Sequence, residues 1–238
     1  MFQTILVAPL YNSFIFLVDL THGNVGWAII LLTLCIRVLF YGAFTASIKT
    51  QMGMQEVQGE LADINETYKD NSEERAKRTM ELFKEKKIRP FAGLLALIVQ
   101  IPVFLALYFA LFREGLPHIA TQLLYPFVHI PTTITTVFIG IPLLVPHNLM
   151  LAGIVAITQY IAIHFSLART ASVSHHLSKE QEMAQRMQRV TMLYTMPLIL
   201  GFLSYSFPAA VGLYFATGNI VSIVQELIIR RQLVKKSA

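Results

Sequence analysis

The chain has 238 residues, of which 55% are hydrophobic and only 14% are charged. Soluble domains carry about 25% charged residues, so this sequence has too little charge to cover a soluble globule of its size. The single cysteine excludes an internal disulfide and a multi-thiolate metal site within one chain. The net charge of +5 fits either nucleic acid or anionic lipid as a partner, and the positions of the charges favour lipid.

The first 25 residues contain an apolar segment without a basic start or a small-residue cleavage site, so it does not match a signal peptide. Its apolar residues recur at helical spacing, with polar residues such as Asn12 and Asp19 between them. We therefore expect residues 1–25 to form an amphipathic helix that lies in the outer membrane interface. A sixth membrane span is the alternative interpretation.

Five apolar segments follow, each close to the length of about 20 residues that a helix needs to cross a bilayer. Residues 47–90, 169–189 and 230–238 hold nine, four and four of the 19 Lys and Arg residues, whereas residues 113–147 hold one. Because cytoplasmic loops carry the excess of Lys and Arg, we expect the N-terminus outside and the C-terminus in the cytoplasm. The predicted spans are 26–46, 91–112, 148–168, 190–207 and 210–229, the last two joined by a tight turn at Phe207-Pro208-Ala209.

Residues 47–90 form the one long polar segment. Its apolar residues recur every three to five positions, and Asn71 with Glu74 resembles a capping box that starts a second helix. We expect an antiparallel helical hairpin in the cytoplasm that receives hydrophobic clients on its flexible methionine side chains, namely Met52, Met54 and Met80. The alternative is a solvated hairpin whose charges only keep it soluble. Residues 169–189 are expected to be a cytoplasmic loop and residues 230–238 a cytoplasmic tail.

The segment 113–147 holds five prolines and little charge. These residues predict an irregular extracytoplasmic loop that lies against the membrane interface.

Arg37 lies inside the first predicted span, about eleven residues from its start. An arginine at the bilayer centre costs about 2.5–3.5 kcal/mol on insertion scales, and no acidic residue of another span is at a similar depth. We therefore expect Arg37 to face a hydrated cavity. Thr33 and Tyr41 lie one turn to either side on the same helix face. Polar candidates from the other spans are Gln100, Gln159, Tyr214, Ser222 and Gln225. For each single Gln, Ser or Thr, a hydrogen bond between helices is the competing explanation.

Catalytic and metal-binding motifs are missing from the sequence. It has no Ser-His-Asp set, no HExxH and no phosphate-binding glycine loop, and the spacing of its histidines matches no metal motif. We therefore expect no enzyme activity, no metal and no cofactor.

Several motifs resemble those of the YidC/Oxa family of membrane protein insertases. The motifs are Trp27-Ala-Ile-Ile with Ile36-Arg37, Gln100-Ile-Pro102-Val-Phe-Leu-Ala-Leu-Tyr108, Phe207-Pro208-Ala-Ala, Leu213-Tyr214 and Asn219-Ile-Val-Ser-Ile-Val-Gln225. The resemblance runs from Pro9 to Arg231. It implies a hydrophilic groove that opens to the cytoplasm and to lipid, with Arg37 as the groove arginine and Gln100 in its lining. It also implies nascent membrane proteins and the lipid bilayer as partners, with the Sec translocon and the ribosome as further candidates.

The sequence therefore predicts an all-α, multi-pass membrane protein of a bacterial plasma membrane. Five transmembrane helices would surround the groove, with a cytoplasmic helical hairpin and an N-terminal interfacial helix. The expected function is insertion and folding of transmembrane segments without nucleotide. One alternative is an anion transporter or channel that uses Arg37 as its binding charge. The other is a chaperone subunit that holds helices without inserting them.

Overall fold

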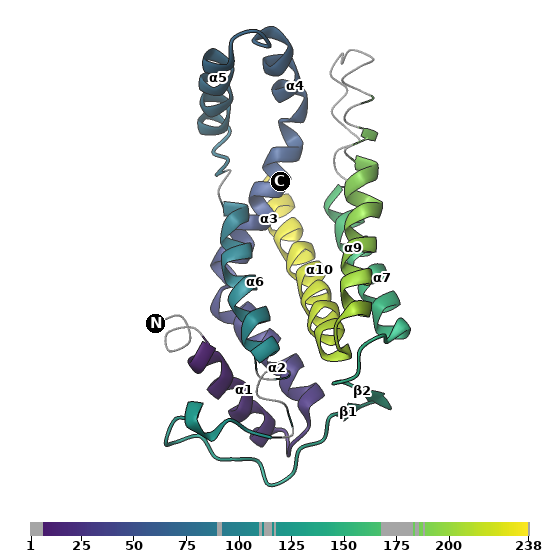
Figure 1. The fold of residues 1–238 in the computed structure, drawn as a ribbon. Helices are drawn as coiled ribbons and strands as arrows, with labels where there is room; N and C mark the ends of the chain where they lie inside the picture. The colour runs from purple at the N-terminus through teal and green to yellow at the C-terminus, as the bar shows by residue number, and fades with distance from the viewer. Residues whose placement is uncertain are drawn as a thin grey trace.

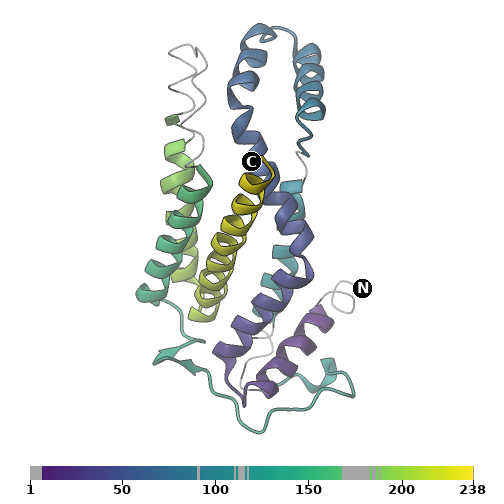
Figure 2. The same ribbon diagram turned by 180° about the vertical axis from the view of Figure 1, so that it is seen from behind.

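The computed structural model describes residues 7–89, 92–109, 111, 116, 118–167, 183, 186–187 and 189–237. Outside residues 118–148, the described chain is almost entirely helical, as predicted. The helices form a long bundle with α10 (Ala209–Ser237) in its middle. On one side of α10 lie α7 (Leu149–Leu167) and α9 (Met196–Ser206), and on the other lies α2 (Val25–Leu39) (Figures 1 and 2). We call the end of the bundle at residues 118–148 the loop end and the opposite end the hairpin end.

Two of the described helices, α7 and α10, are long and apolar enough to cross a bilayer. A third span results if α2 and α3 (Tyr41–Glu56) count as one broken helix, because they are bent by 74° where they meet at Phe40. The segment 26–46, expected as one span, thus belongs to two helices. Phe40 leaves helical geometry, with φ −101° and ψ 24°, and the neighbouring Gly42 weakens the helix further.

The remaining apolar helices are shorter, so the count of five spans stays a prediction. Helix α6 (Ala92–Tyr108) has 17 residues, which corresponds to about 25 Å. Helix α9 has 11 residues and follows a π-helical turn, η5 (Thr191–Thr195). The predicted turn at Phe207 and Pro208 is confirmed between α9 and α10. Helix α10 continues to Ser237, so the segment expected as a tail is helical, and the loop 169–189 lies mostly outside the described residues.

Helix α1 (Ala8–Leu20) is attached to the loop end of the bundle. Asn12, expected on a water-facing side, is buried, and its amide binds the loop: Nδ2 donates to the Leu123 carbonyl at 2.8 Å and Oδ1 accepts from the Tyr125 N–H at 2.7 Å. The exposed face of the helix carries Ser13 and Asp19 together with Phe16 and Leu20. Helix α1 therefore packs on the protein through a mostly apolar face that also buries Asn12, and its place in the membrane interface stays a prediction.

The hairpin end consists of α4 (Gln58–Thr67) and α5 (Ser72–Glu85), which extend beyond the bundle (Figure 1). The predicted cap is confirmed, since the Asn71 side chain accepts from the Glu74 N–H at 3.1 Å. A small core joins the two helices, and its buried residues are Val57, Leu82 and Phe83. Lys86 donates to Glu60 at 2.8 Å, and this carboxylate raises the pKa of the lysine. Residues 58–85 therefore fold as two helices packed together, whereas the first part of the hairpin predicted for residues 47–90 belongs to α3, which begins at Tyr41.

Residues 118–148 are more ordered than expected. They contain a 3₁₀ turn, η3 (Thr121–Leu123), and a two-stranded antiparallel hairpin of β1 (Val137–Phe138) and β2 (Ile141–Pro142). Backbone hydrogen bonds tie this segment to the helix ends: Ala209 and Ala210 N–H donate to Val145 and Leu143 carbonyls at 3.1 and 2.9 Å. The chain stays ordered despite its prolines because helix ends supply the hydrogen bonds that its own backbone lacks.

Candidate functional site

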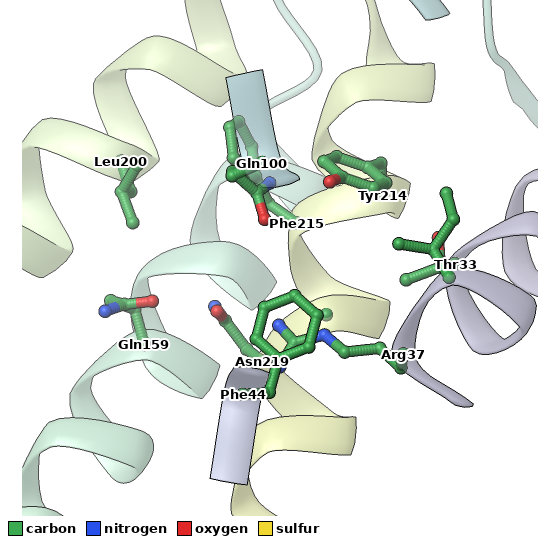
Figure 3. Close-up of a pocket in the computed structure, with 11 residues that line it drawn as sticks. Thr33, Arg37, Phe44, Gln100, Gln159, Leu200, Tyr214, Phe215 and Asn219 are labelled. Carbon is green, nitrogen blue, oxygen red and sulfur yellow. The ribbon is translucent and has the colours of Figure 1, made fainter. Parts of the chain in front are cut away.

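A pocket of about 270 Å³ lies in the middle of the bundle, where six helices meet around Arg37 (Figure 3). This volume has room for several water molecules. We call it the Arg37 pocket, and it is lined by Thr33, Ile36, Arg37, Phe44, Gln100, Gln159, Leu200, Tyr214, Phe215, Gly218 and Asn219. Its lining mixes one cation with amide, hydroxyl and aromatic groups, so it offers hydrogen-bond donors in an otherwise apolar bundle.

Arg37 lies in the last turn of α2 and extends toward α10 (Figure 3). Its guanidinium carbon is 4.2 Å from the centroid of the Phe44 ring, a cation–π contact. On the α10 side, a Cβ at Gly218 would lie 3.3 Å from Arg37 Nη2. The absence of a side chain at Gly218 therefore lets the guanidinium lie close to the α10 backbone. The carbonyl end of α2 also favours a positive charge in this turn.

The bend at Phe40 creates the contact between Arg37 and Phe44. In a straight helix the two residues would be seven positions, or about 10 Å, apart along the axis. Arginine side chains on such a helix also lean toward its N-terminus, which is away from Phe44. With α3 turned by 74° relative to α2, the ring faces the guanidinium instead.

Within the described part of the chain, no carboxylate forms a salt bridge with Arg37. The acidic residue on α10, Glu226, instead pairs with Arg230 at 2.7 Å near the hairpin end. The group that interacts with the charge of Arg37 is the neutral Tyr214. The Tyr214 hydroxyl is also within hydrogen-bonding reach of Gln100, which is neutral as well. The guanidinium thus keeps donors for a further partner such as water or an anion.

The wall between α7 and α10 is held by side-chain hydrogen bonds. Asn219 Nδ2 donates to Thr158 Oγ1 at 3.1 Å, and Thr158 Oγ1 donates to the Ile154 carbonyl at 2.8 Å. Toward the loop end, the ring of Phe104 on α6 lies 5.8 Å from that of Phe207 and 6.4 Å from that of Phe215. Aromatic packing therefore contributes to covering the pocket on its loop side.

Five of the eight side chains selected from sequence line the Arg37 pocket: Thr33, Arg37, Gln100, Gln159 and Tyr214. Tyr41 and Gln225 lie outside it but contact each other, since Gln225 Nε2 donates to the Tyr41 carbonyl at 3.3 Å and to Thr45 Oγ1 at 2.9 Å. Ser222 is partly buried and does not line the pocket. The bend separates Tyr41 from the Arg37 face, because it starts a helix of different direction.

Phe44 and Asn219 line the pocket but were not selected from sequence. Asn219 could have been selected from sequence, because it is a polar residue in an apolar segment, five positions after Tyr214. Phe44 could not have been, since its position depends on the bend.

The hairpin methionines differ in exposure. Met52 is buried and Met54 packs against the hairpin core, whereas Met80 is exposed. Met52 is therefore packed in the fold, and Met54 keeps only part of its surface free.

The described residues hold no group of three or more His, Cys, Asp or Glu side chains that could bind a metal ion. The chemistry available in the pocket is hydrogen bonding and electrostatic attraction of negative charge.

Comparison with known proteins places these features in a family. The family described as 60Kd inner membrane protein matches residues 16–236. The chain is 31% identical over 239 residues to the membrane protein insertase YidC of Oceanobacillus iheyensis, covering 98% of this chain and 85% of that protein. It is 30% identical over 241 residues to the insertase YidC of Polynucleobacter asymbioticus and 31% identical over 233 residues to that of Shewanella halifaxensis. These two alignments cover 100% and 97% of this chain but only 37% and 38% of those longer proteins.

The chain therefore belongs to the 60Kd inner membrane protein family, a class of multi-pass membrane proteins. The resemblance stated from its sequence motifs is confirmed.

Proposed function

We propose that this protein is a membrane protein insertase and chaperone that works without nucleotide. The observation that carries the proposal is the Arg37 guanidinium, which lies beside neutral groups in a polar-lined pocket between apolar helices. The names of the relatives, membrane protein insertase YidC, support the same function.

Insertion requires moving the polar flank of a client segment across about 30 Å of hydrocarbon. A hydrated groove that includes the Arg37 pocket shortens this dry path from the cytoplasmic side. The guanidinium attracts the acidic end of a client while that end crosses. Release into lipid then follows, because burying the apolar segment in lipid gains about 25 cal/mol per Å². Aromatic packing around Phe104 supports a groove that is closed on its loop side.

The proposed topology places the hairpin end in the cytoplasm and the loop end outside, with five crossings. The excess of Lys and Arg in residues 47–90, 169–189 and 230–238 supports this orientation. The α4–α5 hairpin would meet the client first, and Met80 is the exposed methionine available for that contact. The proposed partners are nascent membrane proteins and the bilayer, with the Sec translocon and the ribosome as further candidates.

The experiment compares the purified chain with its Arg37→Ala variant in liposomes. A short client with an acidic extracytoplasmic tail is translated in their presence, and its membrane integration is measured. We expect Arg37→Ala to reduce integration of this client, while a client with a neutral tail inserts normally. Lys49→Ala, which removes an exposed cation outside the pocket, is the matched control and should leave both clients unaffected.

Three results would contradict the proposal. Normal integration of the acidic client by Arg37→Ala would exclude the electrostatic role of Arg37. Anion flux in the same vesicles, without client integration by the unmodified chain, would favour an anion transporter or channel. Capture of client helices without integration would favour a holding chaperone.

A further inference from the structure

The turn between β1 and β2 has an unusual residue at its tip. Ile139 and Gly140 have φ angles of +50° and +78°, so both occupy the left-handed region that a two-residue hairpin turn requires. The first of these positions normally carries Asn, Asp or Gly, because a β-branched side chain is strained there. Ile139 is also 82% exposed. An apolar side chain therefore projects from a backbone conformation that is unfavourable to it.

The rest of this β-hairpin is fixed to the helices. Phe138 is buried, and its ring lies 5.4 Å from that of Trp27 at the start of α2, edge to face. Leu143 is fully buried, and its carbonyl accepts from the Ala210 N–H at 2.9 Å, at the start of α10. The position of Ile139 is thus set by contacts with two helices, and the tip is not a loose loop.

The segment that carries the tip is uncharged. No Asp, Glu, Lys or Arg occurs anywhere in residues 115–168, whereas turns that face water are rich in polar residues. Val137 beside the tip is exposed, as are Leu149 and Met150 at the start of α7. Figure 1 shows β1 and β2 at the edge of the molecule, next to the ends of α7 and α10. The exposed apolar surface of α7, a helix long enough to cross a bilayer, therefore continues onto the hairpin.

We propose that the tip of the β1–β2 hairpin, with Ile139 at its apex and Val137 beside it, inserts among phospholipid acyl chains at the loop end of the bundle. Contact with lipid removes the exposed apolar surface from water, which compensates for the strained backbone. Because residues 115–168 carry no Asp, Glu, Lys or Arg, inserting the tip does not require desolvating a charged side chain of this segment. Through Phe138 and Leu143, the inserted tip fixes how deep α2 and α10 begin in the membrane. The proposal is independent of the proposed insertase activity.

The test uses the fact that Trp27 is the single tryptophan of the chain. In a Trp27→Phe background, the Ile139→Trp variant of the full chain is reconstituted into phosphatidylcholine and phosphatidylglycerol vesicles. Some vesicles contain phospholipid brominated on its acyl chains, which quenches nearby tryptophan. The control is Lys69→Trp in the same background, at an exposed position in the α4–α5 turn. We expect Ile139→Trp to emit at shorter wavelength than Lys69→Trp and to lose most of its fluorescence in brominated vesicles.

Because a substitution at the strained position could disturb the turn, Val137→Trp provides a second probe on the same hairpin with ordinary backbone geometry. Emission like that of Lys69→Trp, without quenching, for both variants would place the tip in water and overturn the proposal. Short-wavelength emission without quenching would mean that protein, such as a second copy, covers the tip, and it would equally overturn the proposal.

Discussion

Phe44 controls how firmly the Arg37 guanidinium is held. The cation–π contact at 4.2 Å is worth about 0.5–2 kcal/mol, depending on how well water is excluded. Phe44→Leu keeps an apolar side chain but removes the ring, so the guanidinium loses this fixed position. We expect integration of an acidic-tailed client to fall about fivefold, the equivalent of ~1 kcal/mol. Phe44→Tyr retains the ring face and should keep nearly full activity in the same liposome assay. Equal activity of Phe44→Leu and the unmodified chain would contradict this role.

Gly218 provides a second test of the guanidinium position. Since a Cβ there would lie 3.3 Å from Arg37 Nη2, Gly218→Ala should displace the guanidinium slightly and reduce client integration a few-fold. The variant should not be less stable, because Ala is favoured over Gly within a helix by about 1 kcal/mol. The matched control is Gly153→Ala on α7, where a Cβ would meet nothing within 4 Å. Thermal unfolding in detergent and client integration, measured together, separate the two effects. Loss of integration in both variants would assign it to helix stiffness.

At the scale of single elements, the Asn71 cap sets the stability of α5. Its side chain accepts from the Glu74 N–H, and replacing such a cap by Ala costs about 1 kcal/mol. Asn71→Ala should therefore speed amide hydrogen exchange in the first turn of α5 about fivefold. Asn65→Ala makes the same change at an exposed position inside α4, where Ala is the better helix former, and exchange there should slow slightly. Unchanged exchange in Asn71→Ala would show that the cap does not hold the helix.

The elements differ in how well sequence predicts them. The Asn71 cap and the turn at Pro208 depend on neighbouring residues, so local patterns suffice. The bend at Phe40 has no proline, and only Gly42 nearby suggests weakness. Its direction depends on packing of α3 against α6 and α10, which a linear sequence does not reveal. The order of residues 118–148 was missed for a related reason. Their hydrogen-bond partners are helix ends distant in the chain, such as Ala210 for Leu143.

At the scale of the whole molecule, sequence likewise predicts only part of the lining of the Arg37 pocket. Arg37 is recognisable from sequence because a charge inside an apolar segment needs a polar environment. Thr33, Gln100, Gln159 and Tyr214 could be selected because they are polar residues within apolar segments. Ser222 and Gln225 met the same criterion but do not line the pocket, and Gln225 instead donates to the Tyr41 carbonyl beyond the bend. Polarity therefore predicts candidates, and the tertiary structure decides which of them meet.

The orientation of the whole molecule can be tested with cysteine labelling. The charge distribution predicts that the α4–α5 turn is cytoplasmic and that residues 118–148 are outside, because Lys and Arg concentrate in cytoplasmic segments. Cys35 is the single cysteine, so Cys35→Ala gives a background without thiols. Lys69→Cys and Thr132→Cys each place one thiol at an exposed position, on the hairpin and on the loop.

A membrane-impermeant maleimide added to intact bacterial cells should label Thr132→Cys at once. It should label Lys69→Cys only after the membrane is permeabilised. The reverse pattern would contradict this topology, because the hairpin end would then lie outside the cell. Labelling of both variants in intact cells would also contradict it, because an even number of crossings would then separate the two positions.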